Sequence, residues 1–138
     1  MDSSNRYAGV GAVFVGGMLG TLLRFLASQT PGVLNIFVVN VVGAFLLAVV
    51  VGWITGSGAL TRTKLRFRLF LGTGLMGGFT TYSTLAFQTA ALAAEGAWMR
   101  TLTYALGTVV VGAVASVIGL LVGRFCALHA GRRTKGHV

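Results

Sequence analysis

Residues 77–84 read GGFTTYST and lie near the middle of an apolar stretch, Phe70–Ala94. Two glycines followed by four Ser and Thr residues within five positions are a poor choice for the centre of an uninterrupted helix. The pattern predicts a helix that is broken at membrane depth, where its free carbonyl groups suit a small hard cation and its free N–H groups suit an anion. An intact helix with a packed Ser/Thr face is the alternative.

Three more apolar stretches accompany this one, at residues 7–29, 33–54 and 101–126. A membrane-crossing helix needs roughly 20 mostly apolar residues, and the four stretches take up most of the 138 residues. Only 9% of the residues are charged and the mean hydropathy is +0.85, whereas a soluble domain has about 25% charged residues. The sequence therefore predicts a single all-α domain over residues 1–138, with four transmembrane helices.

The net charge of +9 comes from eleven Lys and Arg residues against two acids. These cations lie in short loops and tails, which indicates topology signals and contacts with anionic membrane lipid rather than a nucleic-acid partner. With four spans, nine of the eleven fall on the side of both termini, and only Arg24 and Arg100 fall on the other. The positive-inside rule then predicts a plasma-membrane protein with cytoplasmic termini, inserted in one orientation.

The acids Asp2 and Glu95 both lie outside the apolar stretches. A small multidrug-type transporter needs a carboxylate inside the membrane to bind its cation and a proton, so this class is disfavoured. The two histidines, His129 and His137, have no metal-ligand spacing, and no catalytic Ser, His and Asp or Cys and His set is evident. We therefore expect that the protein is not an enzyme.

A few polar residues stand inside the apolar stretches. Asn40 interrupts a run of valines and is interpreted either as an interhelical hydrogen-bonding residue or as a pore-lining donor. Tyr104 and Thr108 share one stripe of the last stretch, which is typical of a narrow polar path or of helix packing. Arg24 either extends its side chain to the interface or gives a vestibule positive potential.

Glycines four residues apart occur in three of the stretches. In lipid, small residues at this spacing allow close approach of two helix backbones. The pairs are Gly16 and Gly20, Gly74 and Gly78, and Gly119 and Gly123.

Three separated motifs together resemble the small fluoride channels, the Fluc (CrcB) family. The motifs are Gly16-Gly17-x-x-Gly20-x-x-x-Arg24-Phe25, Val39-Asn40-x-x-Gly43-x-Phe45 and Gly77-Gly78-x-Thr80-Thr81-Tyr82-Ser83-Thr84. The resemblance implies an antiparallel dimer that exports fluoride passively and lowers fluoride toxicity. It also implies a structural sodium ion at the dimer interface, held by the main-chain carbonyls of Gly77 and Thr80.

The same resemblance, together with the hydroxyl and amide donors, gives an expected anion path. Its residues are Asn40, Thr81, Tyr82, Ser83, Leu85, Tyr104 and Thr108, with Arg24 at a vestibule. The family usually has phenylalanine at the positions of Tyr82 and Leu85, and glutamate is common at that of Gln88. These departures leave two further interpretations open, namely a homodimer or a heterodimer with a related, oppositely oriented chain, and a conducting or a non-conducting subunit.

Overall fold

The computed structural model describes residues 3–29 and 32–135 of the chain, with side chains for residues 7–29 and 32–130. Every regular element in this part is a helix, which confirms the prediction of an all-α protein. In chain order the elements are α1 (Ser3–Ala27), α2 (Val33–Gly56), α3 (Arg62–Arg68), the π-helix η1 (Leu69–Met76), α4 (Gly77–Phe79), α5 (Tyr82–Ala94) and α6 (Trp98–Lys135).

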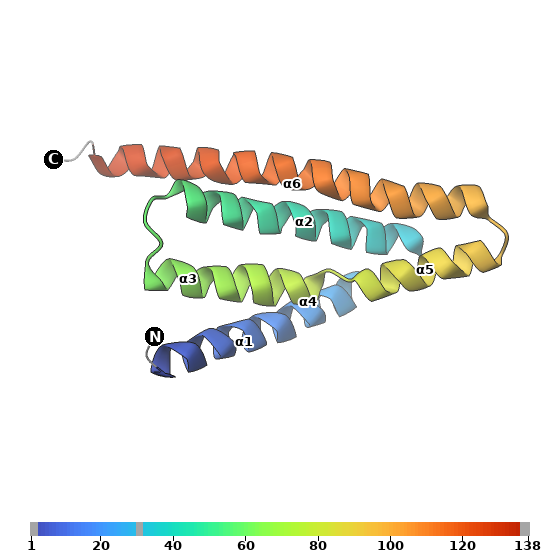
Figure 1. Ribbon diagram of the computed structural model, residues 1–138, viewed down its shortest axis with the longest axis horizontal. Coiled ribbons are helices and arrows are strands. Elements are labelled where there is room, and N and C mark those ends of the chain that lie inside the picture. Colours follow the sequence, from blue (N-terminus) through green and yellow to red (C-terminus); the bar gives the residue numbers. More distant parts are fainter. Residues whose placement is uncertain (1–2, 30–31, 136–138) are drawn as a thin grey trace.

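Among the described residues, three helices are long and apolar enough to cross a membrane, at Tyr7–Ala27, Val33–Gly56 and Trp98–Ala130. The stretch predicted at Phe70–Ala94 is helical but not one continuous α-helix. Elements α3, η1 and α4 follow one another directly, and α5 begins only after two residues with extended backbone. We call these four elements the α3–α5 run; it forms the third of the four helical passes of the chain, between α2 and α6 in the sequence (Figure 1).

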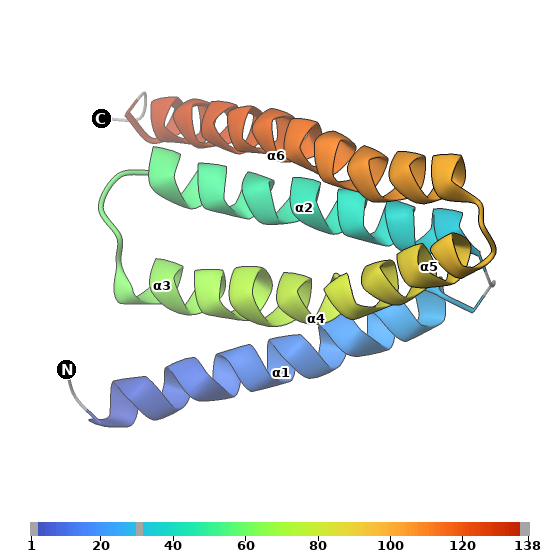
Figure 2. The same ribbon diagram turned by 45° about the vertical axis from the view of Figure 1, so that its right-hand side comes forward.

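The passes lie side by side as an open row, in the order α6, α2, α3–α5 run and α1 (Figures 1 and 2). The most extensive contacts join α2 to α6, and α1 to η1 and α4. The beginning of α1, the α2–α3 connection and the end of α6 lie at one end of the row, and the α5–α6 connection lies at the other (Figure 1). The side chains of Arg6, Arg132, Arg133 and Lys135, which the orientation prediction uses, lie outside the described set.

Glycines make both of the extensive contacts possible, as their spacing predicts. A Cβ atom on Gly16 or Gly20 would collide with the backbone of η1, and one on Gly78 would collide with the backbone of α1. On α6, Cβ atoms at Gly119 and Gly123 would collide with the backbone of α2. Because no side chain separates these backbones, they approach closely without a polar contact between them.

The open row leaves most apolar side chains uncovered. Ile36, Val39, Ile54 and Met76 are among the few buried apolar residues, and no large side chain of the described residues is fully buried. Many large apolar side chains on the outer helices α1 and α6 are exposed. Such a surface requires an apolar environment, which lipid and further protein chains provide.

Candidate functional site

The backbone changes direction where the α3–α5 run leaves the helical conformation. Thr80 has φ −79° and ψ 157°, and Thr81 has φ −146° and ψ 119°. Both residues are therefore extended, between the end of α4 at Phe79 and the start of α5 at Tyr82. We call these two residues the interruption; α5 starts a new helix there, so the N–H groups of its first turn have no partner within the helix backbone.

Asn40, in the first half of α2, binds the main chain of the interruption. Its Oδ1 accepts a hydrogen bond from the Thr81 N–H at 2.8 Å, and its Nδ2 donates to the Thr81 carbonyl at 3.0 Å. The side-chain amide thus pairs with both polar groups of one extended residue, as a neighbouring strand would. Asn40 leaves one of its two amide N–H groups for another acceptor.

The interruption frees carbonyl groups from the helical hydrogen-bond pattern. In an α-helix the N–H of residue i+4 donates to the carbonyl of residue i. The Thr81 N–H, which would serve Gly77, donates instead to Asn40. The Thr84 N–H, which would serve Thr80, donates to the Thr81 hydroxyl at 3.2 Å. The carbonyls of Gly77 and Thr80 are thus among those at the end of α4 that have no helical donor.

Arg24 reaches the interruption from the last turn of α1. Its Nη1 donates to the Thr80 carbonyl at 3.2 Å, and the side chain is partly buried. The guanidinium adds a positive charge beside the Thr80 carbonyl.

A groove of about 340 Å³ lies beside the interruption. It is lined by Asn40, Gly43, Ala44, Leu47, Thr80, Thr81, Tyr82, Leu85, Thr108, Val109 and Gly112. Residues from α2, the α3–α5 run and α6 therefore meet in one place, although they are far apart in the sequence. Thr81 and Thr108 are each 5% exposed, whereas Tyr82 is 82% exposed.

Comparison with known proteins decides the family. Residues 11–120 match the family described as CrcB-like protein, Camphor Resistance (CrcB). The chain belongs to the CrcB family. Three relatives are named fluoride-specific ion channels, and none of them is named as an enzyme. These names confirm the expectation that the CrcB chain is not an enzyme.

The relatives are bacterial and resemble the chain over most of its length. FluC 2 of Leifsonia xyli is 42% identical over 120 residues, which are 80% of this chain and 80% of that protein. FluC 1 of Cutibacterium acnes is 39% identical over 111 residues, 76% of this chain and 78% of its own length. FluC 1 of Geobacillus kaustophilus is 35% identical over 118 residues, 81% of this chain and 95% of its own length.

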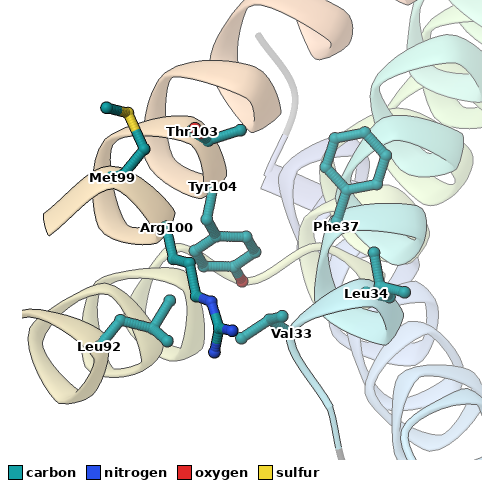
Figure 3. A pocket seen from close by; sticks show the side chains of 8 residues that line it. All are labelled: Val33, Leu34, Phe37, Leu92, Met99, Arg100, Thr103 and Tyr104. Carbon is teal, nitrogen blue, oxygen red and sulfur yellow. The ribbon is translucent and has the colours of Figure 1, made fainter. Parts of the chain in front are cut away.

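The groove of this CrcB chain contains five of the seven residues expected along the path, namely Asn40, Thr81, Tyr82, Leu85 and Thr108. Ser83 lies next to them, with its hydroxyl 3.2 Å from that of Thr81. Tyr104 lies one helical turn from Thr108 and lines a different cavity, shown in Figure 3. Gly77 does not line the groove, and a Cβ atom added to it would meet nothing within 4 Å.

Two residues of the CrcB chain make contacts near the groove that sequence reasoning missed. Gln88 accepts a hydrogen bond from the Tyr104 hydroxyl at 2.6 Å, which links α5 to α6. Gly43 lies three residues after Asn40, and a Cβ atom there would collide with the Thr80 side chain. The spacing of Asn40 and Gly43 on one helix face is the only sequence signal for this contact.

Proposed function

We propose that the chain is a subunit of a fluoride-specific channel, which lets fluoride leave the cell passively through the plasma membrane and so lowers its toxicity. The observation that carries this proposal is the groove beside the interruption, where Asn40, Thr81 and Thr108 meet in a chain of the CrcB family. The groove is lined by no carboxylate. Glu95, the acid within the described residues, is exposed at the end of α5.

The groove offers groups that can replace part of the hydration shell of a small anion. Asn40 has a second amide N–H, and the first N–H groups of α5 begin at Tyr82, which lines the groove. The positive end of the α5 dipole favours a negative charge there. In this proposal the interruption lies near the middle of the membrane, where an anion needs such donors most.

We also propose a structural sodium ion bound by the carbonyls of Gly77 and Thr80. Oxygen atoms are the ligands that hard cations prefer, and unwound carbonyls bind sodium in other membrane proteins. The hydrogen bonds of Asn40 and Thr81 leave both carbonyls without their helical donors. The Thr80 carbonyl has two lone pairs, so a cation can share it with Arg24. When bound, the ion supplies a fixed positive charge that holds carbonyl groups together.

The proposed assembly is a dimer of oppositely oriented chains, in contact with membrane lipid. The exposed Tyr82 beside the groove and the open row both leave surface for a second chain. The partner is a second copy or a related chain. The uneven distribution of Lys and Arg favours a related chain of opposite bias, because each chain then inserts in one orientation. A C-terminal reporter found equally on both sides of the membrane would favour the homodimer.

Fluoride release from reconstituted vesicles tests the proposed function. Vesicles loaded with potassium fluoride receive valinomycin, and a fluoride electrode records the efflux. We expect passive fluoride efflux, with far less efflux from vesicles loaded with potassium chloride. Equal efflux of both anions would contradict a fluoride-specific channel, and efflux that needs a proton gradient would indicate a transporter. Efflux only in the presence of a related chain would identify a non-conducting subunit of a heterodimer.

A further inference from the structure

A second cavity opens at the end of the row where α5 joins α6. Its volume is about 550 Å³, and its walls include Phe37 of α2, Leu92 of α5, and Met99 and Tyr104 of α6. Most of the lining is apolar, and Arg100 is its only charged side chain. Figure 3 shows the Arg100 side chain extending from α6 past the ring of Tyr104 toward the beginning of α2.

Arg100 has no partner within the part of the chain that the structure describes. No hydrogen bond or ion pair joins its guanidinium to another described residue, and the residue is exposed. Glu95, the carboxylate nearest to it in the sequence, does not line the cavity. The cavity therefore contains a full positive charge that the described chain does not neutralise.

A run of polar groups on α6 connects this cavity to the groove. Tyr104 lines the cavity and is 9% exposed. The Thr108 hydroxyl donates to the Tyr104 carbonyl at 2.6 Å, and Thr108 lines the groove beside the interruption. The two spaces are thus lined by residues one turn apart on the same helix.

We infer that the cavity is a mouth of the anion path, where Arg100 attracts fluoride from solution toward Tyr104. This inference rests on the proposed fluoride function and extends it to a residue outside the groove. Walls of low dielectric constant focus the field of a charge, and such focusing raises the local concentration of a counter-ion by about 10- to 1000-fold in favourable clefts. The four cations of α3 lie at the opposite end of the row. Arg24, the other cation on the Arg100 side, does not line this cavity and donates instead to the Thr80 carbonyl.

The test removes the charge and then restores it in place. The chain has one cysteine, Cys126, so an Arg100→Cys variant in a Cys126→Ser background has a single thiol. We expect Arg100→Gln and Arg100→Cys to conduct fluoride about fivefold more slowly than wild type at low ionic strength, in vesicles of neutral phosphatidylcholine. A cationic methanethiosulfonate reagent should restore the rate in Arg100→Cys, and an anionic reagent should lower it further.

Salt and a matched variant separate focused attraction from other effects. The Debye length falls from about 30 Å at 0.01 M to about 3 Å at 1 M salt, so the difference between wild type and Arg100→Gln should vanish at high salt. Glu95→Gln changes the charge by one unit at the same end but outside the cavity, and we expect it to change the rate by less than about 1.5-fold. If Glu95→Gln raises the rate as much as Arg100→Gln lowers it, the rate depends on the overall surface potential and not on the cavity. That result would overturn the inference.

The remaining outcomes are also decisive. A salt-independent loss that the cationic reagent does not repair would indicate a structural role for Arg100 and overturn the inference. An effect that appears only in vesicles with anionic lipid would indicate that Arg100 binds a lipid phosphate instead. If wild type conducts fluoride and Arg100→Gln conducts equally well at low salt, only this inference fails. If wild type shows no fluoride flux, alone or with a related chain, the proposed function fails as well.

Discussion

The contact between α2 and α6 and the interruption between α4 and α5 bring helices together by different means. Along α2 and α6, the backbones approach because Gly119 and Gly123 have no side chains. At the interruption, the side chains of Asn40 and Arg24 bind carbonyl groups that a helix would otherwise use. The first contact depends on the small volume of glycine, and the second depends on polar side chains. Larger residues should therefore damage the first, and loss of a polar group should damage the second.

The largest effect is expected at the α2–α6 contact. A Cβ atom on Gly123 would collide with the Val49 carbonyl and lie only 2.7 Å from the main-chain nitrogen of Trp53. Gly123→Ala should therefore lower the free energy of unfolding by about 2 kcal/mol. Gly107→Ala is a matched control on the same helix, because its Cβ would meet nothing within 4 Å. Thermal unfolding in detergent measures both, and equal stability of the two variants would contradict the role of the glycine contact.

The next effect concerns the hydrogen bonds to the interruption. Asn40→Ala removes both bonds to Thr81, and Asn40→Asp replaces the donor with a negative charge in the groove. We expect fluoride flux to fall about tenfold or more in both variants while the dimer still assembles, because a buried polar group without a partner costs about 1–3 kcal/mol. Flux equal to wild type, in assembled protein of both variants, would assign Asn40 to helix packing alone.

A smaller but more specific effect is expected at the sodium site. A Cβ atom added to Gly77 meets nothing within 4 Å in the described chain, so we expect the isolated subunit to keep its fold in Gly77→Val. If sodium raises the unfolding temperature of the proposed dimer relative to choline, as the account predicts, we expect this variant to lose that rise. Thr80→Ala removes one hydroxyl hydrogen bond, to the Met76 carbonyl, but keeps the main-chain carbonyl of Thr80. Thr80→Ala should therefore retain the sodium effect. If Thr80→Ala loses the sodium effect and Gly77→Val keeps it, ligation by the main chain would be refuted.

The smallest effect is expected at Tyr82. Its ring is 82% exposed in the single chain, so Tyr82→Phe should change the free energy of unfolding by less than about 0.5 kcal/mol. The variant keeps the electropositive ring edge, which suits an anion, and we expect fluoride flux within about twofold of wild type. A loss of flux by tenfold would show that the hydroxyl group itself takes part in conduction.

The helices and the place of the glycine contacts could be predicted from composition and spacing alone, because apolar length and small-residue spacing are local properties. The unusual residues at 77–84 likewise marked the segment where Thr80 and Thr81 become extended. Helix α6 is longer than the predicted 101–126 because good helix formers continue beyond the apolar stretch.

The partners of the polar residues could not be predicted. Asn40 and Thr81 are 41 positions apart, and Arg24 and Thr80 are 56 apart. Their pairing depends on which helices become neighbours in the row and on the rotation of each helix about its axis. The spacing of residues within one helix determines neither of these. For the same reason, nothing in the sequence directs Tyr104 toward Gln88 or Arg100 into the second cavity.

The most direct test of the central claim is a reversal potential in a planar bilayer, with the assembled channel between fluoride on one side and an equal concentration of chloride on the other. A passive fluoride-specific channel predicts a current without any proton gradient. Its reversal potential should lie far toward the value that stops fluoride flow, and it should stay there when the chloride concentration changes. A reversal potential near zero, or one that follows chloride, would contradict the account.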